Sequence, residues 1–437
     1  MNSSPDKYIY INIYLPNKGF TPAGVISFND ERGYGGFSYF PAYIEQDLPP
    51  LNPATLNYRT QNSRHFVVDK SNQHLLDRTF WEMLPQQNDW GNQVLISRYP
   101  HYSYMNNAQK LYFLGKRTVG GLQSYVSDRD EEISVDSLEW LDKIRDESIE
   151  FFQKNIEKIT QVKAVTPLSS YGGLRPKCMF EDEEGNHWIA KFNLPSDLYN
   201  MARAEHVSLN MAQDMGLNVA QSKVITLPSG QDVFLSKRFD RQGTTRLHSI
   251  SFFALAPGAQ MVKKDAFIPG NPAGFVQTLT RLYSDFENID SANIVTKFLL
   301  DIAVNNTDNH LRNLRLLLNK NNKWELSPIY DVTFNPYKQP HVYNPANVKV
   351  SELFLENQDL PQHMASELGV SKFTVESKLY RVKEVAQRWE EYCDRAKVSD
   401  EDKVKIGNAV SLGLNKKELE HKITVKVDNS LKLKPKS

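Results

Sequence analysis

The chain is poor in cysteine and in long hydrophobic runs, and it carries no net charge. Its 437 residues include two cysteines, Cys178 and Cys393, which lie too far apart for a metal-type spacing and argue against a disulfide framework. The sequence contains no run of about 18 apolar residues, which is the length needed to span a membrane. Basic and acidic residues both number 52, so no overall charge favours nucleic acid or a membrane surface. The N-terminus lacks the shape of a signal peptide, and we therefore expect a soluble, cytoplasmic protein.

The order of predicted elements divides the chain into three parts. Residues 1–127 are rich in strand signals, beginning with an alternating aromatic and β-branched run at 8–15 that has a hairpin partner after it. Residues 128–250 open with a charged break and a helix expected at 137–160. A strand, a glycine-bearing turn, a strand, a helix and a strand follow. This order predicts a β-rich N-terminal part and a separate mixed unit behind it.

The third part, residues 251–437, is mostly helical and contains one clear hairpin. Its last long helix is expected at 374–393, where apolar side chains follow one stripe. We interpret this stripe as a face packed in the core, and a partner-binding surface is the alternative.

The candidate chemistry lies where a buried helix, a polar loop and the hairpin follow one another. The loop contains Asp308 and, five residues later, Asn313; the hairpin ends shortly before Asp331. Because a hairpin brings its flanking segments together, we expect Asn313 and Asp331 to meet at one end. The Asp-x-x-x-x-Asn spacing is that of a protein-kinase catalytic loop. There the Asp accepts the proton of the substrate hydroxyl, and the Asn and a later Asp hold magnesium.

The same residue types also have plainer interpretations. Asn and Asp are common in turns, so the spaced pair alone recurs by chance, and the surrounding helix, loop and hairpin are what favour a kinase. His310 is grouped with the cofactor-binding residues. Its expected role is a hydrogen bond that organises the loop, and metal ligation is the alternative.

The second part contains candidate residues for binding nucleotide phosphates. Gly172 and Gly173 let backbone N–H groups approach a phosphate, and Arg175 and Lys177 add positive charge. This is no Walker A loop, because the GxxxxGK[ST] pattern is absent from the sequence. A Gly-Gly turn taken alone is more often a simple hairpin.

A lysine on a strand and a glutamate on the next helix complete this set of candidate residues. Lys191 stands among apolar residues on its strand, which is costly unless a charge or a phosphate meets it. Glu205 lies on the following helix, and a strand lysine paired to a helix glutamate orients phosphates in kinases. A surface Lys and a surface Glu would be the plain interpretation of either residue alone. The strand at 233–241 then ends in a charged connector whose backbone could meet an adenine.

Taken together, these segments resemble the HipA family of bacterial toxin kinases. The resemblance covers residues 8–395 roughly, and Asn-Thr-Asp-Asn-His at 306–310 is its most specific piece. The segments that carry it are 88–91, 114–122, 169–177, 204–220, 237–241, 246–249, 305–313 and 327–331. The resemblance implies an α+β fold, a divergent two-lobed protein-kinase-like fold with an N-terminal β-rich accessory subdomain.

The resemblance also implies roles for single residues. Asp308 would be the catalytic base, with magnesium on Asn313 and Asp331 and the nucleotide phosphates on Lys191. The adenine hinge would be formed by Lys237, Arg238 and Phe239.

A regulatory serine is implied as well. Ser170 falls where family members carry an autophosphorylated serine, and Ser169 is close enough to share the assignment. A phosphate there would carry about two negative charges beside the nucleotide phosphates, so it should expel the glycine-bearing loop and weaken ATP binding. A serine that merely caps a turn is the alternative.

At the level of function, the resemblance implies an ATP- and Mg²⁺-dependent serine/threonine kinase that is the toxin of a toxin–antitoxin pair. Its partner would be a helix-turn-helix antitoxin, through which alone it would meet DNA. Its substrate would be a translation component, notably an aminoacyl-tRNA synthetase. Two alternatives are a kinase-fold co-repressor scaffold and a metal-dependent phosphoesterase that uses Asp308, His310 and Asp331.

Overall fold

The computed structural model of the protein describes most of the chain between residues 8 and 414. The described residues are 8–29, 34–59, 65–69, 77–85, 89–105, 107–115, 118, 120–125, 175–182, 184, 186–227, 229–242, 245–255, 290–336, 361–362, 365–366 and 370–414. The helix expected at 137–160, the serines Ser169 and Ser170 and the glycines Gly172 and Gly173 lie outside these residues. Within the described part of the chain, no helix is both long and apolar enough to cross a membrane.

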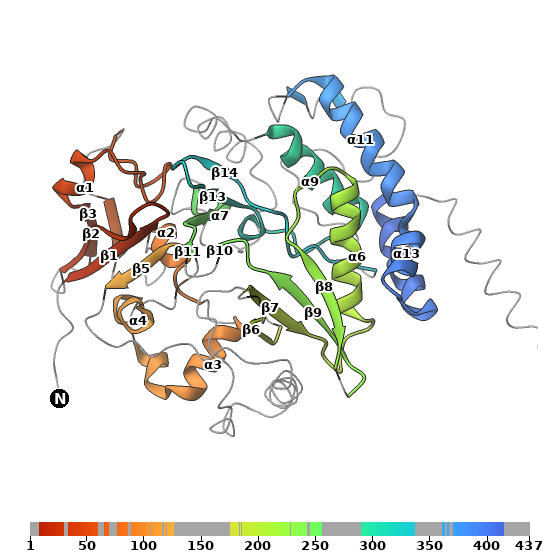
Figure 1. The fold of residues 1–437 in the computed structure, drawn as a ribbon, viewed down its shortest axis with the longest axis horizontal. Coiled ribbons are helices and arrows are strands. Elements are labelled where there is room, and N and C mark those ends of the chain that lie inside the picture. Colours follow the sequence, from red (N-terminus) through yellow and green to blue (C-terminus); the bar gives the residue numbers. More distant parts are fainter. Residues whose placement is uncertain are drawn as a thin grey trace, which may run out of the picture.

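The N-terminal part is built on a five-stranded antiparallel sheet, drawn in red and orange in Figure 1. In the spatial order β4-β3-β2-β1-β5, its strands are β4 (His65–Asp69), β3 (Tyr34–Tyr39), β2 (Gly19–Asn29), β1 (Tyr8–Leu15) and β5 (Leu122–Tyr125). The predicted strand and its hairpin partner are thereby confirmed. Ile9, Ile11 and Ile13 are buried at alternate positions of β1, as the two-residue period of a strand requires. The helices of this part are α1 (Pro41–Glu45), α2 (Arg78–Trp81), α3 (Trp90–Arg98), η1 (Pro100–Tyr104) and α4 (Asn107–Leu114).

A second, four-stranded antiparallel sheet carries Lys177 and Lys191, two of the residues expected to bind the nucleotide phosphates. In the order β6-β7-β9-β8, its strands are β6 (Lys177–Glu181), β7 (His187–Phe192), β9 (Asp232–Lys237) and β8 (Ser222–Thr226). Trp188, Ala190 and Phe192 of β7 are buried in a small apolar cluster on one side of the sheet. The alternate residues Ile189 and Lys191 therefore face the other side. Helix α6 (Met201–Asp214) packs against β8 and β9.

The third part joins a small sheet to a group of helices. The predicted hairpin is confirmed as β13 (Arg315–Leu318) and β14 (Trp324–Leu326), and β12 (Ser249–Ser251) pairs with β13 as a third strand. The remaining elements are β10 (Arg241–Gln242), β11 (Thr245–Arg246), α7 (Phe252–Leu255), α9 (Ser291–Ala303), η4 (Leu311–Asn313), α11 (Lys372–Gln387), α12 (Trp389–Arg395) and α13 (Asp400–Leu414).

The single helix expected at 374–393 is wrong, because the segment forms the two helices α11 and α12. They are separated at Arg388, whose φ of −98° and ψ of 22° leave the α-helical region. The apolar stripe is nevertheless a core face, as we interpreted it. Val382, Val385, Trp389 and Cys393 are all buried.

Helix α9 is the buried helix that leads into the candidate catalytic loop, and α11 and α13 pack against it at the right of Figure 1. Its residues from Ile294 to Ala303 are all buried. Gly413 permits the approach of α13: a Cβ at this position would clash with the carbonyl oxygen of Ile302 and lie 2.5 Å from that of Ala303. The close packing fixes the C-terminal end of α9, from which the loop starts.

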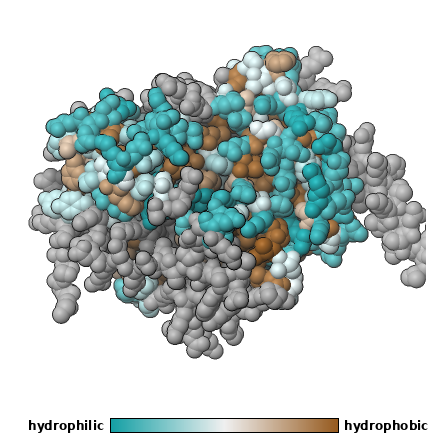
Figure 2. Space-filling view, in the orientation of Figure 1, coloured by the Kyte–Doolittle hydropathy of each residue, from teal (hydrophilic) through white to brown (hydrophobic). Residues whose placement is uncertain are grey.

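The N-terminal part packs directly against the rest of the molecule. Its contacts include hydrogen bonds from Asn52 Nδ2 to Ala254 O (2.9 Å), Arg78 to Phe253 O (3.1 Å), Trp90 Nε1 to Lys177 O (3.0 Å) and Arg241 to Gly120 O (3.0 Å). Figure 2 shows that hydrophilic residues cover much of this face over the N-terminal part and the C-terminal helices, with hydrophobic residues between them. The domain boundaries expected at residues 127 and 250 stay a prediction.

Candidate active site

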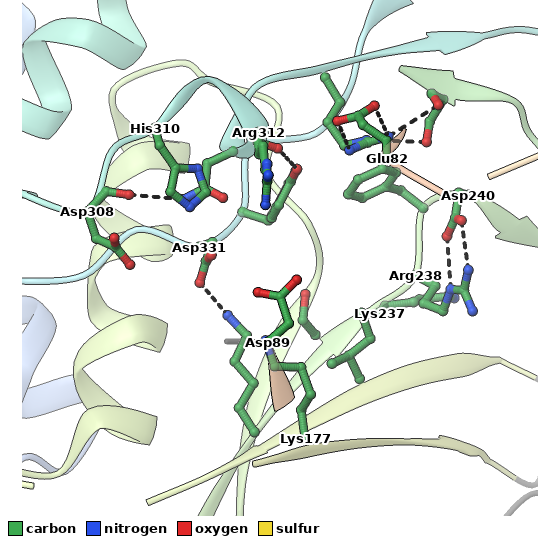
Figure 3. A pocket seen from close by; sticks show the side chains of 18 of the residues that line it. Glu82, Asp89, Lys177, Lys237, Arg238, Asp240, Asp308, His310, Arg312 and Asp331 are labelled. Carbon is green, nitrogen blue, oxygen red and sulfur yellow. Dashed lines mark hydrogen bonds and ion pairs between the residues drawn. The ribbon is translucent and has the colours of Figure 1, made fainter. Parts of the chain in front are cut away.

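A pocket lies between the four-stranded sheet and the candidate catalytic loop (Figure 3). All three parts of the chain contribute to its walls. The four-stranded sheet supplies Lys177, Ile189, Lys191, Ser236 and Lys237, and the connector after it supplies Arg238, Phe239 and Asp240. The loop side supplies Asp308, His310, Arg312, Asn313, Arg315, Tyr330 and Asp331, and β12 supplies Ser249. The N-terminal part supplies Glu82, Leu84 and Asp89. The structure therefore brings most of the predicted site residues together in one cleft.

Two lysines face the cleft side by side on neighbouring strands. Lys177 of β6 stands directly opposite Lys191 of β7 in the antiparallel register. Like charges in this arrangement repel each other, and their burial adds a further cost. Burial lowers the pKa of Lys177 to about 8, and the positive charge of Lys191 acts in the same direction. A buried lysine beside a partly buried one is suited to an anion that touches both.

Lys191 is the centre of an ion-pair network that links the sheet, α6 and the loop side. Its Nζ lies 2.7 Å from Glu205 Oε1 and 2.6 Å from Asp331 Oδ1. Burial lowers the pKa of Lys191, but the carboxylates of Asp331 and Glu205 outweigh it and raise the pKa above its ordinary value. The predicted pairing of the strand lysine with the helix glutamate is present in this geometry. Glu205 holds the lysine from behind, while Asp331 lies in the wall of the pocket.

Asp308, Asn313 and Asp331 lie in the wall opposite the lysines. Asn313 Nδ2 donates a hydrogen bond to the backbone oxygen of Asp308 at 3.2 Å, which orients the amide and leaves Oδ1 as an acceptor. Asp331 adopts a φ of +57°, in the left-handed region that Asp tolerates better than most residues. Such backbone strain is frequent at functional sites.

The surroundings of the two aspartates of the pocket shift their pKa values in opposite directions. Asp308 is exposed at the rim, but the protein around its carboxylate raises its pKa, and the negative charge of Asp331 raises it further. At Asp331, burial is outweighed by the ammonium groups of Lys191 and Lys177, which lower the pKa below its ordinary value. Asp331 thus stays ionised, while Asp308 is the better proton acceptor of the two.

A buried polar network supports the catalytic loop from below. Lys297 and Asp301, both on α9 and both buried, are joined by bonds of 2.6 and 2.5 Å from the ammonium to the two carboxylate oxygens. Asn306 Nδ2 donates to the same carboxylate at 2.8 Å, and its Oδ1 accepts from the backbone N–H of Asp308 at 3.4 Å. The loop is therefore tied to the helix that precedes it.

The predicted hinge residues Lys237, Arg238 and Phe239 line the pocket at its other end. The backbone N–H groups of Lys237 and Arg238 already donate to Gln221 O and His187 O, both at 2.8 Å. Phe239 differs, since its N–H donates no hydrogen bond to another described residue. Its ring lies 5.5 Å from that of Tyr330, centre to centre.

Some predicted residues are placed elsewhere. Arg175 does not line the pocket, because its guanidinium binds both carboxylate oxygens of Asp197 at 2.7 and 2.6 Å. His310 lines the pocket, and its backbone N–H donates to Asp308 O at 3.0 Å. This backbone bond closes a turn of the loop, and the organising role expected of the His310 side chain stays a prediction.

Sequence reasoning missed several residues of the pocket. Arg312, Arg315 and Tyr330 stand beside the motif residues, so their proximity in sequence was an available signal. Glu82 and Asp89 come from the N-terminal part, more than 200 residues before the catalytic loop. Asp89 lies in the segment 88–91 that carries part of the resemblance, but no local pattern places either residue at this pocket.

The donor set fits magnesium if the nucleotide supplies the remaining ligands. Asn313 and Asp331 offer an amide oxygen and an ionised carboxylate, which are hard ligands of the kind Mg²⁺ prefers. Among the residues that the structure describes, no group of three or more His, Cys, Asp or Glu side chains could hold a metal ion. Asp308, His310 and Asp331 are accordingly not gathered into such a group.

Comparisons with known proteins define the class and then the family. The fold is α+β and kinase-like with a β-rich N-terminal part, as expected. Residues 169–397, more than half of the chain, match the family model of the HipA-like C-terminal domain. The chain belongs to the HipA family. The search of curated proteins finds no match.

Two solved structures resemble the whole or part of the chain. One is a chain of the complex of the toxin–antitoxin system HipA and HipB of Shewanella oneidensis MR-1 with its operator DNA, with 14% identity and a TM-score of 0.60 over 93% of this chain and 96% of the other. At this identity the likeness shows the shared fold. The other is the proinflammatory kinase CtkA of Helicobacter pylori, with 14% identity over 61% of this chain and 97% of that one. Its TM-score of 0.37 is too low to support an argument.

Proposed function

We propose that the protein is an ATP- and Mg²⁺-dependent serine/threonine protein kinase, the toxin of a toxin–antitoxin pair. The observation that supports this most strongly is the position of Lys191. It contacts Glu205 at 2.7 Å and Asp331 at 2.6 Å in the same pocket that contains Asp308 and Asn313. A strand lysine paired to a helix glutamate, next to an Asp-x-x-x-x-Asn loop, is the constellation that phosphoryl transfer from ATP uses.

Each residue has a defined part in this proposal. Lys177 and Lys191 bind the phosphates, and the connector around Phe239 meets the adenine. Asn313 and Asp331 would hold Mg²⁺, which neutralises the charge that develops on the transferred phosphoryl group. Asp308 accepts the proton of the attacking hydroxyl, for which its raised pKa suits it.

The partners and targets rest on the family relationship. The Shewanella oneidensis complex contains HipB and operator DNA. We infer a corresponding helix-turn-helix antitoxin for this chain, with DNA contacted only through that partner. The proposed substrate is a translation component such as an aminoacyl-tRNA synthetase in the cytoplasm. Autophosphorylation at Ser170 or Ser169 would silence the enzyme, since the added charge opposes the nucleotide phosphates.

The test is intact-mass spectrometry with peptide mapping after incubation with Mg-ATP, beside an Asp308→Asn control. One added phosphate on Ser170 or Ser169 in the wild type and none in the control would support a kinase with Asp308 as its base. We expect the substitution to slow transfer by about 10²- to 10⁴-fold, the usual contribution of a general base. A wild-type protein that gains no mass and binds no ATP would overturn the proposal.

A further inference from the structure

The arginines of the pocket differ in what holds them. Asp240 binds Arg238 through two hydrogen bonds of 2.9 and 2.7 Å, and Glu82 lies 3.4 Å from Arg315. The guanidinium of Arg312 forms no hydrogen bond or ion pair with any residue that the structure describes, and its Nε is buried without an acceptor. Arg312 therefore brings a positive charge to the pocket that no carboxylate neutralises by direct contact.

Aromatic rings hold this charge in position. The Cζ atom of Arg312 lies 4.2 Å from the centre of the Trp81 ring and 5.2 Å from that of Phe253. Contacts with rings use the faces of the planar guanidinium and leave the N–H donors at its edge for an acceptor. Tyr330 fixes the backbone, because its hydroxyl donates to Arg312 O at 2.7 Å. The side chain is thus held ready for a ligand before the ligand arrives.

The position of Arg312 indicates which ligand this is. Figure 3 shows Arg312 on the catalytic-loop wall and Lys177 on the opposite, sheet-side wall, with the carboxylates of Asp89 and Asp331 between them in the view. Burial lowers the pKa of Arg312 and outweighs the carboxylates of Asp89 and Glu82, which act in the opposite direction, so the charge carries an energetic cost in the free protein. An anion that passes between the two walls would meet cations on both sides. A chain of phosphates has the length and the charge to do this.

We propose that Arg312 binds the phosphate chain of the nucleotide from the wall opposite Lys177 and Lys191. This inference rests on the proposed function, because it takes ATP as the ligand of the pocket. A guanidinium donates two parallel hydrogen bonds to phosphate oxygens, which adds direction as well as charge. Arg312 is therefore a nucleotide-binding residue in addition to those that the kinase pattern predicts.

The experiment measures equilibrium binding of ATP and of adenosine by calorimetry in the Asp308→Asn background, in which turnover is expected to be slow. Arg312→Met keeps the apolar stem against the two rings and removes the charge. We expect it to weaken ATP binding about ten- to hundredfold, the range for a lost charge-assisted hydrogen bond, and to leave adenosine binding unchanged. Arg312→Lys keeps the charge without the fork, and we expect a smaller loss for ATP alone. Arg381→Met, an exposed arginine on α11 paired with Glu384, is the matched control.

The other outcomes contradict the inference in different ways. An unchanged affinity for ATP in Arg312→Met would overturn it, and a raised KM for a protein acceptor would then place Arg312 on the acceptor side. An equal loss for ATP and adenosine would assign Arg312 a structural role. If Arg312→Met does not fold, Arg312→Lys decides between these outcomes. If the Asp308→Asn protein binds no ATP while Arg312 is intact, the proposed function is overturned as well. This outcome is distinct from a failure of the Arg312 inference, because it occurs before Arg312 is substituted.

Discussion

The two carboxylates assigned to the chemistry, Asp308 and Asp331, are positioned by different regions of the molecule. Asp308 lies on a loop that a buried polar network ties to α9, so its support comes from the third part of the chain alone. Asp331 is held by Lys191, which reaches across the pocket from the four-stranded sheet. The proposed base is thus fixed within one lobe, whereas the carboxylate proposed to bind Mg²⁺ depends on how the two lobes meet. Movement of the sheet would disturb Asp331 before it disturbed Asp308.

The same difference sorts the two residues into two roles. The protein around the carboxylate and a neighbouring negative charge raise the pKa of Asp308, while two ammonium groups lower that of Asp331. Two carboxylates whose environments move their pKa values apart are suited to proton transfer and to metal binding, respectively. If Asp308 and Asp331 have these two roles, substitutions of the two residues should impair different steps, proton transfer and Mg²⁺ binding.

The largest effect expected is that of Asp331→Asn on Mg²⁺-dependent ATP binding and on transfer. The loss of a charged ligand should abolish the gain in ATP affinity that Mg²⁺ gives and lower the transfer rate by about 10²-fold or more. Asp308→Asn should lower the rate but keep that gain in affinity. ATP titrations with and without Mg²⁺ measure the difference. If the ATP affinities of the two variants depended equally on Mg²⁺, the assignment of different roles to Asp308 and Asp331 would be wrong.

The network below Asp308 offers the next largest effect. Asp301→Asn leaves the buried ammonium of Lys297 without a charged partner, which should cost about 3–5 kcal/mol of unfolding free energy. The loop should also lose its anchor, so that kcat falls about ten- to hundredfold while the KM for ATP changes little. Denaturant unfolding and steady-state kinetics measure both.

The double variant Lys297→Met, Asp301→Asn is the control for this pair. It should lose less stability than the two single variants together, because it leaves no unpaired buried charge. Additive losses would show that the pair does not act as a unit.

The parts of the site that the sequence predicted are those whose residues lie close together along the chain. Asn313 and Asp331 flank a short hairpin whose strands pair locally, so their meeting could be inferred from pattern alone. Lys191 and Glu205 also lie on neighbouring elements. Arg175 shows the limit: its charge was visible, but competition from Asp197, which binds it at 2.6 Å, was not.

The rest of the site depends on long-range packing. Trp81 supports Arg312 only because the N-terminal part folds against α7 and the catalytic loop, and no periodicity in either segment encodes that contact. The break between α11 and α12 at Arg388 could not be predicted from the apolar stripe either, because the stripe continues through it. Local pattern gave the elements and the order of the motifs, while packing decided which charges are free to bind a ligand.

A smaller effect is expected where α13 meets α9. Gly413→Ala places a methyl group against the carbonyl groups of Ile302 and Ala303, which should force the helices apart and cost about 1–3 kcal/mol of unfolding free energy. Thermal and denaturant unfolding measure this loss. Leu412→Ala, at an exposed position of the same helix, is the control and should change stability by about 0.5 kcal/mol or less. A wild-type stability for Gly413→Ala would mean that the helices adjust freely and do not fix the loop.

The smallest effect expected is on the sheet side, in the pH dependence of ATP binding. Lys177 has a pKa of about 8 in the free protein because of its burial and the charge of Lys191. A bound phosphate favours the protonated form of Lys177 and raises that pKa. At pH values at which Lys177 is neutral in the ATP-free protein, ATP binding therefore takes up a proton. Between about pH 7 and pH 9 the affinity for ATP should therefore fall, by about tenfold at most.

Calorimetry at pH values on both sides of 8, in buffers of different ionisation enthalpy, measures affinity and proton uptake together. Lys177→Met should bind ATP more weakly at pH 7 and lose most of the dependence on pH, since it removes the titrating group. Asp308→Asn should keep the wild-type dependence, because Asp308 belongs to the opposite wall. A slope that persists in Lys177→Met would assign the titration to another group, and the sheet side would then owe its affinity for phosphate to Lys191 alone.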